Sequence, residues 1–145
     1  MKTVAVLLSL VFVVTFLALP LAFGQEGLDP KLFEGPWAGT WISDKAHRDK
    51  APMLALIQVD LDARVPTASI IMFQVPKPPA PEFSSLSIGR IENGKIVIDA
   101  ASSGIGGGGS EMTFWLESPL LLKGTYKNEF DSGTFEFKRT SGRGA

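Results

Sequence analysis

The sequence contains no cysteine and only one histidine in its 145 residues. A chain without cysteine forms no disulfide bond and offers no thiolate to a metal, so a packed core has to stabilise the folded state. The sequence also has no large excess of positive or negative charge, because it contains 14 Lys and Arg residues and 15 Asp and Glu residues. Nucleic acid recognition depends on a basic surface, and we therefore expect no nucleic acid partner.

Groups that would carry catalysis are also sparse. His47 lies in a charged segment beside Arg48 and Asp49, whereas a metal site needs several converging ligands and a haem site needs an apolar pocket. The carboxylates are scattered, and no Ser–His–Asp arrangement is evident. We predict no metal, no cofactor and no enzymatic activity, with a barrel-type isomerase or hydrolase as the weaker alternative.

No segment of the predicted mature chain shows the periodicity of a helix. Instead, apolar and polar residues alternate in short segments, most clearly over 57–62, as in strands with one face in a core. The Asn93-Gly94 pair is a strong hairpin signal between two such segments. Eight strands are predicted, at 37–42, 53–62, 67–75, 86–92, 95–100, 111–117, 120–126 and 133–139. This pattern predicts an all-β fold, an antiparallel up-and-down barrel of about eight strands.

The phrase Gly-Thr-aromatic occurs three times, once near the start of the predicted barrel and twice at its end. Threonine and aromatic residues suit a pleated sheet, and glycine lets a strand bend or lets a neighbouring backbone come close. In a closed barrel the first and last strands are neighbours, so the three copies would meet. The copies are Gly39-Thr40-Trp41, Gly124-Thr125-Tyr126 and Gly133-Thr134-Phe135.

Residues 1–24 are predicted to be an export signal. The segment 4–19 is almost entirely apolar, Pro20 follows it, and the small residues Ala22 and Gly24 form a cleavage site before residue 25. The alternative is an uncleaved membrane anchor, since an apolar stretch of this length could span a bilayer. With cleavage, the protein is periplasmic or secreted and contacts the membrane only through the signal during export.

The predicted mature chain divides into a loose polar lead-in (25–35), a barrel domain (36–139) and a flexible tail (140–145). Its long loops at 43–52, 76–83, 101–110 and 127–132 follow alternate strands, so they gather on one rim of the barrel. The short turns at 63–66, 93–94 and 118–119 fall on the opposite rim. The loop at 76–83 is rich in proline and the loop at 101–110 in glycine. The glycine loop is predicted to be flexible, with a lid at the mouth of the barrel as its functional interpretation.

With the residues arranged in this way, the chain resembles the lipocalin-like (calycin-type) single-barrel domains of exported bacterial proteins, a group of unknown function. The resemblance covers about residues 33–139. It rests on the segment 35–41 around Trp37, on Asn93-Gly94, and on the last two Gly-Thr-aromatic motifs together with the residues that follow them as far as Arg139.

The resemblance implies a structural role for Arg139, because in calycins a basic residue near the last strand covers a tryptophan of the first strand. That tryptophan would be Trp37 or Trp41, and Arg139 would cap it at the closed end of the barrel. The two tryptophans could instead line a ligand cavity. The candidate ligand-binding residues are Trp37, Trp41, Phe114, Tyr126 and Phe135, and Trp115 is expected to face outward.

The leading functional hypothesis is non-catalytic binding of a small apolar ligand in the barrel, or of a protein such as an envelope protein at the long-loop rim. The alternative is an inhibitor or accessory module of an envelope or secreted enzyme. An apolar cavity would favour the ligand, and a filled interior would favour the protein partner.

Overall fold

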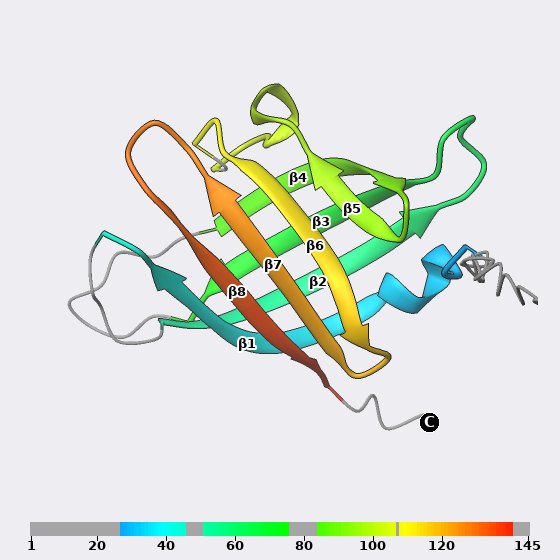
Figure 1. The fold of residues 1–145 in the computed structure, drawn as a ribbon, viewed down its shortest axis with the longest axis horizontal. Helices are drawn as coiled ribbons and strands as arrows, with labels where there is room; N and C mark the ends of the chain where they lie inside the picture. The colour runs from blue at the N-terminus through cyan, green and yellow to red at the C-terminus, as the bar shows by residue number, and fades with distance from the viewer. Residues whose placement is uncertain (1–26, 46–50, 76–83, 107, 141–145) are drawn as a thin grey trace, which may run out of the picture.

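The computed structural model describes residues 27–45, 51–75, 84–106 and 108–140, which form a closed antiparallel β-barrel (Figure 1). Each strand pairs with the next along the chain, and the last pairs with the first. The predicted all-β barrel of eight strands is therefore confirmed. The strands are β1 (Gly35–Ser43), β2 (Ala51–Asp60), β3 (Thr67–Gln74), β4 (Ser84–Glu92), β5 (Lys95–Ile98), β6 (Glu111–Ser118), β7 (Leu121–Lys127) and β8 (Ser132–Arg139).

Strand ends differ from the prediction by a few residues. β2 stops at Asp60, because the Asp60 carboxylate accepts a hydrogen bond from the Asp62 amide at 2.9 Å and turns the chain. β5 stops at Ile98, and a short 3₁₀ helix, η2 (Ala100–Ser102), follows it. The predictions for the export signal, His47, the loop at 76–83 and the tail beyond residue 140 concern residues outside the described ranges.

The glycines of the three Gly-Thr-aromatic phrases all lie where the chain comes close to a neighbour. A Cβ atom on Gly39 would overlap the carbonyl oxygen of Glu136, and one on Gly133 would overlap that of Ile42. Both contacts lie in the ladder that joins β1 to β8 and closes the barrel. At Gly124 the neighbour is an aromatic ring of the core. Glycine at these positions therefore permits the close approach of the closing strands.

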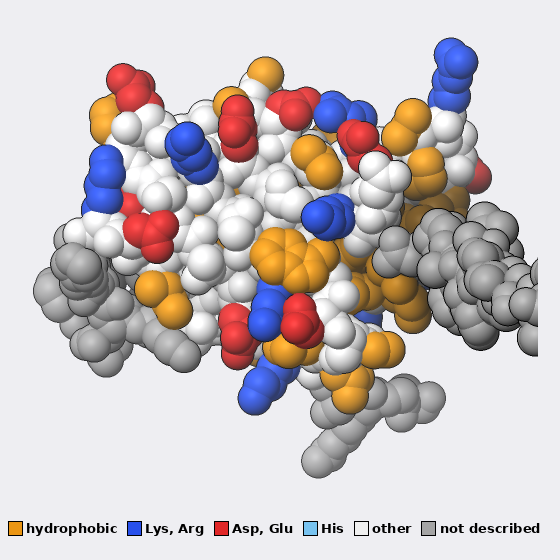
Figure 2. Space-filling view, in the orientation of Figure 1, with side chains coloured by type: hydrophobic (Ala, Val, Ile, Leu, Met, Phe, Trp, Pro, Cys, Tyr) orange, Lys and Arg blue, Asp and Glu red, His pale blue; other side chains and the backbone are white. Residues whose placement is uncertain are grey.

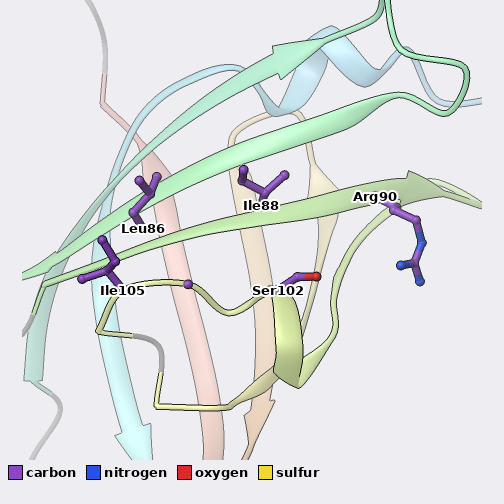
Figure 3. Close-up of a pocket in the computed structure, with 6 residues that line it drawn as sticks. Leu86, Ile88, Arg90, Ser102 and Ile105 are labelled. Carbon is purple, nitrogen blue, oxygen red and sulfur yellow. The ribbon is translucent and has the colours of Figure 1, made fainter.

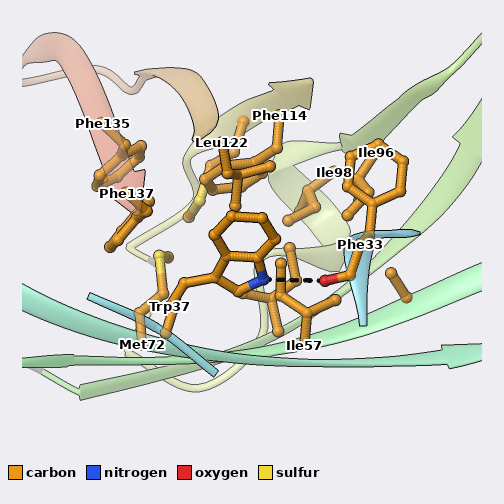
Figure 4. Close-up of a cluster of buried hydrophobic side chains, with 14 of the residues drawn as sticks. Phe33, Trp37, Ile57, Met72, Ile96, Ile98, Phe114, Leu122, Phe135 and Phe137 are labelled. Carbon is orange, nitrogen blue, oxygen red and sulfur yellow. Dashed lines mark hydrogen bonds between the residues drawn. The ribbon is translucent and has the colours of Figure 1, made fainter. Parts of the chain in front are cut away.

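The buried apolar side chains form one core cluster inside the barrel (Figure 4). Alternate residues of β2 are buried, from Met53 to Val59, while the residues between them are exposed. The largest fully buried side chains include Trp37, Phe114 and Phe137. Such a core can stabilise the chain without disulfide bonds.

The described part of the lead-in, residues 27–35, is not the loose segment that the sequence predicted. Four of its residues form a 3₁₀ helix, η1 (Pro30–Phe33), capped by the Asp29 carboxylate, which accepts a hydrogen bond from the Lys31 amide at 2.9 Å. Phe33 is fully buried and belongs to the core. The indole Nε1 of Trp37 donates a hydrogen bond to the Phe33 carbonyl at 2.9 Å (Figure 4). The lead-in therefore forms a plug for one end of the barrel.

Arg139 holds this plug from outside. Its guanidinium carbon lies 4.2 Å from the centre of the Trp37 ring, as expected for a cation over an indole. The guanidinium also donates hydrogen bonds to the carbonyls of Glu34, at 2.6 Å, and Leu32. The expected contact with a first-strand tryptophan is thus made with Trp37. Trp41 lies further along β1, toward the opposite rim.

Alternate connections lie at opposite ends of the barrel. The β2–β3, β4–β5 and β6–β7 turns lie at the end that carries η1 (Figure 1). The β5–β6 connection and the β7–β8 turn lie at the other end, which we call the long-loop rim. One end of the barrel is therefore sealed by η1, and the other is available for a site.

Candidate functional site

A cavity of about 260 Å³ lies inside the barrel at the long-loop rim. Its walls come from the rim ends of β1, β2, β3, β6, β7 and β8 and from the glycine loop. We call it the rim cavity. The lining residues are Trp41, Met53, Met72, Gly106, Gly108, Ser110, Met112, Tyr126, Asn128, Asp131 and Phe135.

The apolar wall of the rim cavity combines flexible and rigid side chains. Met53, Met72 and Met112 are buried, and their unbranched thioether chains can adapt to occupants of different shape. Tyr126 and Phe135 supply aromatic rings whose centres lie 5.4 Å apart. This combination suits a small apolar molecule.

The structure separates the five predicted ligand-binding residues into two groups. Trp41, Tyr126 and Phe135 line the rim cavity. Trp37 is fully buried in the core next to the plug, and Phe114 also lies in the core, where its ring stacks on Phe135 with ring centres 5.4 Å apart. Sequence reasoning missed the three methionines, because their spacing along the chain gives no sign that they meet.

The β7–β8 turn gives the rim cavity one polar edge. The Tyr126 hydroxyl donates a hydrogen bond to Asp131 Oδ2 at 2.7 Å, and the Ser132 amide donates to Asp131 Oδ1 at 2.8 Å. Asn128 closes the same turn: its side chain donates to the Ser110 hydroxyl and accepts hydrogen bonds from two backbone amides. These contacts hold the polar groups in fixed positions.

Both titratable groups of this edge have shifted pKa values. The Ser43 hydroxyl is the main cause that lowers the pKa of Asp131, and the Tyr126 hydroxyl adds to the effect. Burial, followed by the hydrogen bond to Asp131, raises the pKa of Tyr126 to about 12. At neutral pH the edge therefore presents one carboxylate and one neutral phenol.

The chain has a single tyrosine, so this pKa can be measured without overlap. We expect the phenolate absorbance of the folded protein to rise with a midpoint near pH 12, well above the ordinary value of 10.0. Since the unfolded chain loses this proton first, stability should fall as the pH rises from about 10 to about 12. An ultraviolet titration checks this, and a midpoint at pH 10 in the folded protein would contradict the burial of Tyr126 and its hydrogen bond to Asp131.

The glycine loop follows the wall of the rim cavity. Gly104, Gly106, Gly108 and Gly109 all have positive φ angles, which glycine adopts without strain. Gly106 and Gly108 line the cavity, and the Ile105 carbonyl accepts a hydrogen bond from a β4 amide at 3.0 Å. The loop leads into strand β6, so it lacks the helix that a dinucleotide-binding loop requires.

The inner face of β4 carries an unusual group. Ser85 is buried opposite Met72, and its hydroxyl has no hydrogen-bond partner among the described residues. By contrast, the neighbouring inward hydroxyl of Ser87 donates to the Ser103 carbonyl at 2.7 Å. Burying a hydroxyl without a hydrogen-bond partner lowers the stability of the folded protein. The Ser85 hydroxyl can therefore form one more hydrogen bond on the β4 side of the barrel interior.

A second candidate surface covers the outside of β2, β3 and β4. Its large apolar side chains are each 42–55% exposed, and strand pairing places them side by side. We call it the outer apolar face. Its residues are Leu54, Leu56, Phe73, Leu86 and Ile88. A contiguous exposed surface of this kind is uncommon in a monomer and is typical of an interaction site.

A groove of about 440 Å³ adjoins this face (Figure 3). It lies between the outer side of β4 and the segment around η2, with Leu86, Ile88 and Ile105 as its apolar side chains. Arg90 stands at one end, paired with Asp99 at 2.7 Å and with Glu92 at 2.8 Å. The groove therefore has an apolar floor and an end whose charges are already paired.

The opposite side of the barrel is different. Basic and acidic side chains are mixed on the face formed by β5 to β8 (Figure 2). Trp115 of β6 is half-buried on this outer side and pairs with Lys95 and Lys123, as expected for an outward residue. This face shows no patch of one charge.

The described residues contain no group of three or more His, Cys, Asp or Glu side chains that could hold a metal ion. No helix in the described part of the chain has the length and apolar character needed to cross a membrane. Comparison with known proteins finds no matching family model, no similar curated protein and no similar solved structure. The function is therefore inferred from the fold and from the geometry of the two surfaces.

Proposed function

We propose that this protein is an exported, lipocalin-like binding protein that holds a small apolar molecule in the rim cavity. The observation that carries the proposal is the cavity itself, in which methionine and aromatic side chains meet at the rim opposite the η1 plug. An apolar cavity of about 150 Å³ is large enough for benzene. A cavity of about 260 Å³ suits a somewhat larger molecule, of roughly ten to fifteen non-hydrogen atoms.

The chemistry of the cavity supports binding without catalysis. Asp131 is the one carboxylate among the described lining residues, and hydrogen bonds already hold it ionised. Tyr126 keeps its proton up to a pKa of about 12, far from the range in which a general acid or base works at neutral pH. An isomerase or hydrolase therefore remains the weaker alternative, and the periplasm or the exterior remains the proposed location.

Phenylpropanol, a neutral aromatic alcohol of suitable size, tests the proposal. We expect it to bind the wild-type protein in a calorimetric titration and to bind at least tenfold more weakly to Met112→Trp, whose larger side chain fills the cavity. Thr113→Trp is the matched control, because Thr113 lies on the outer face of the same strand. Equal binding by the two variants, or no binding by the wild type, would contradict a ligand in the rim cavity.

The outer apolar face supports a second candidate function, contact with another protein chain, as in an inhibitor or accessory module. The hypothesis from the sequence placed this contact at the long-loop rim, where Ile105 and Phe130 are exposed, and the outer apolar face on β2 to β4 is a separate group of exposed apolar residues. A second copy of the chain is the partner that can be tested directly. The five side chains of the face carry no charge, so two such faces can meet without repulsion.

We expect the wild-type protein to sediment as a dimer at high concentration and Ile88→Asp to sediment as a monomer, because a carboxylate would be buried in the contact. Val65→Asp is the control, since Val65 is exposed in the β2–β3 turn, away from the face. Monomeric wild-type protein at every concentration would argue against self-association through this face.

A further inference from the structure

The rim cavity has an unbalanced charge. Among the described residues that line it, Asp131 alone is charged. In the described part of this rim, Lys45 is basic, but its ammonium group donates a hydrogen bond to the Phe130 carbonyl, and Lys45 is not a lining residue. Among the described lining residues, an anionic ligand such as a fatty acid would therefore meet a carboxylate and no basic side chain. The charge of the cavity instead favours a cation.

Three aromatic residues line the cavity together with this carboxylate, and one of them, Tyr126, donates a hydrogen bond to it. The ring centres of Trp41 and Tyr126 are 5.9 Å apart with planes inclined at 57°, and those of Tyr126 and Phe135 are 5.4 Å apart at 45°. Because all three residues line the cavity and neighbouring rings are tilted, an occupant can contact ring surfaces of different orientation. The faces of such rings attract cations, and groups of them recognise methylated ammonium ions.

The oxygens of Asp131 are already engaged. They accept hydrogen bonds from the Tyr126 hydroxyl and the Ser132 amide, and the Ser43 hydroxyl also interacts with the carboxylate. A ligand with N–H groups would have to compete with these donors. A methylated ammonium needs only the negative charge and the ring faces. Furthermore, the hydrogen bond from Tyr126 to the carboxylate polarises the phenol and makes its ring more attractive to a cation.

We propose that the rim cavity selects small molecules that carry a quaternary or N-methylated ammonium group, recognised by the rings of Trp41, Tyr126 and Phe135 and by the charge of Asp131. This inference rests on the proposed function, since it specifies the chemical class of the ligand in the same cavity. It requires no conformational change in the described part of the barrel.

Choline and its carbon isostere, a dimethylbutanol in which carbon replaces the quaternary nitrogen, test the role of charge at constant shape. We expect choline to bind about tenfold more tightly than the isostere, as a cation within an aromatic group should. The affinities can be measured by titrating each compound while following the indole N–H resonance of Trp41. The same spectrum shows whether each variant is folded.

Two variants test which side chains cause the preference for choline over its isostere. Asp131→Asn should reduce choline affinity several-fold and leave the isostere unchanged, and Phe135→Leu, which keeps an apolar side chain, should do the same. Asp44→Asn is the matched control, because Asp44 also contacts Ser132 at this rim but does not line the cavity. Its preference for choline should equal that of the wild type.

The outcomes separate the two proposals. If phenylpropanol binds but choline binds no better than its isostere, the ammonium inference is wrong and the proposed function stands. If the preference for choline survives in both Asp131→Asn and Phe135→Leu, the assigned residues are wrong. If neither phenylpropanol nor choline binds, the rim cavity is not a ligand site and both proposals fail.

Discussion

Replacement of Trp37 with alanine is expected to lower the free energy of unfolding by about 3–5 kcal/mol, the range for removing a large aromatic side chain from a core. Trp37 is fully buried, donates a hydrogen bond to the Phe33 carbonyl and lies under the Arg139 guanidinium. Its removal would therefore disturb the barrel interior, the η1 plug and the last residue of β8 together.

Chemical denaturation followed by circular dichroism checks this prediction. Trp115→Ala is the matched control, since the same side chain is removed from a half-buried outer position, and it should cost far less. Where Trp37→Ala is too unstable to purify, Trp37→Phe keeps most of the packing and loses the hydrogen bond, so it should cost about 1–3 kcal/mol. Equal stability of the Trp37 and Trp115 alanine variants would show that the plug does not stabilise the barrel.

The second large effect is expected at Gly39, where alanine should destabilise the protein by about 3 kcal/mol or more. The added Cβ atom would overlap the Glu136 carbonyl and lie 2.6 Å from Phe137 Cα. Both neighbours are backbone atoms, so the change cannot be absorbed by rotation of a side chain. β1 and β8 would have to move apart, and the ladder that closes the barrel would be disturbed.

Thermal unfolding of Gly39→Ala should show a melting temperature many degrees below that of the wild type. Gly27→Ala is the control, because no atom lies within 4 Å of its added Cβ and its φ angle is not positive. A melting temperature for Gly39→Ala equal to that of Gly27→Ala would mean that close contact between β1 and β8 is not required for closure.

The fold could be predicted because its signals are local. Alternation marked the strands, Asn93-Gly94 marked a hairpin, and the repeated Gly-Thr-aromatic phrase marked the strands that close the barrel. The η1 plug could not be predicted in this way. The segment 28–34 shows no alternation that would mark Phe33 as buried and Leu32 as exposed, and only the three-dimensional closure of β1 and β8 creates the space that Phe33 fills.

β4 shows the limit of alternation. Leu86 and Ile88 alternate with serines, which by hydrophobicity alone would place the two apolar residues in the core. In the barrel, however, Ile91 pairs with Ile96 across the Asn93-Gly94 hairpin, and both are buried. Because side chains alternate with a period of two, this register turns Leu86 and Ile88 outward.

Alternation along the strands also predicted part of the candidate site. Inward aromatic positions on β1, β7 and β8 follow from alternation, and Trp41, Tyr126 and Phe135 line the rim cavity. The three methionines and Asp131 come from separate strands and a turn, so only the register of the whole barrel brings them together. The depth of each residue also depends on that register, which is why Trp37 and Phe114 lie in the core below the cavity.

The binding of an apolar ligand in the rim cavity can be tested in one measurement, because the three tryptophans lie in three different places. Trp41 lines the cavity, Trp37 lies in the core next to the plug and Trp115 lies on the outside. In a nitrogen-15 correlation spectrum, titration with phenylpropanol should shift the indole N–H signal of Trp41 and leave those of Trp37 and Trp115 in place. An unchanged Trp41 signal at saturating phenylpropanol, or equal shifts of all three, would contradict a ligand site at the rim.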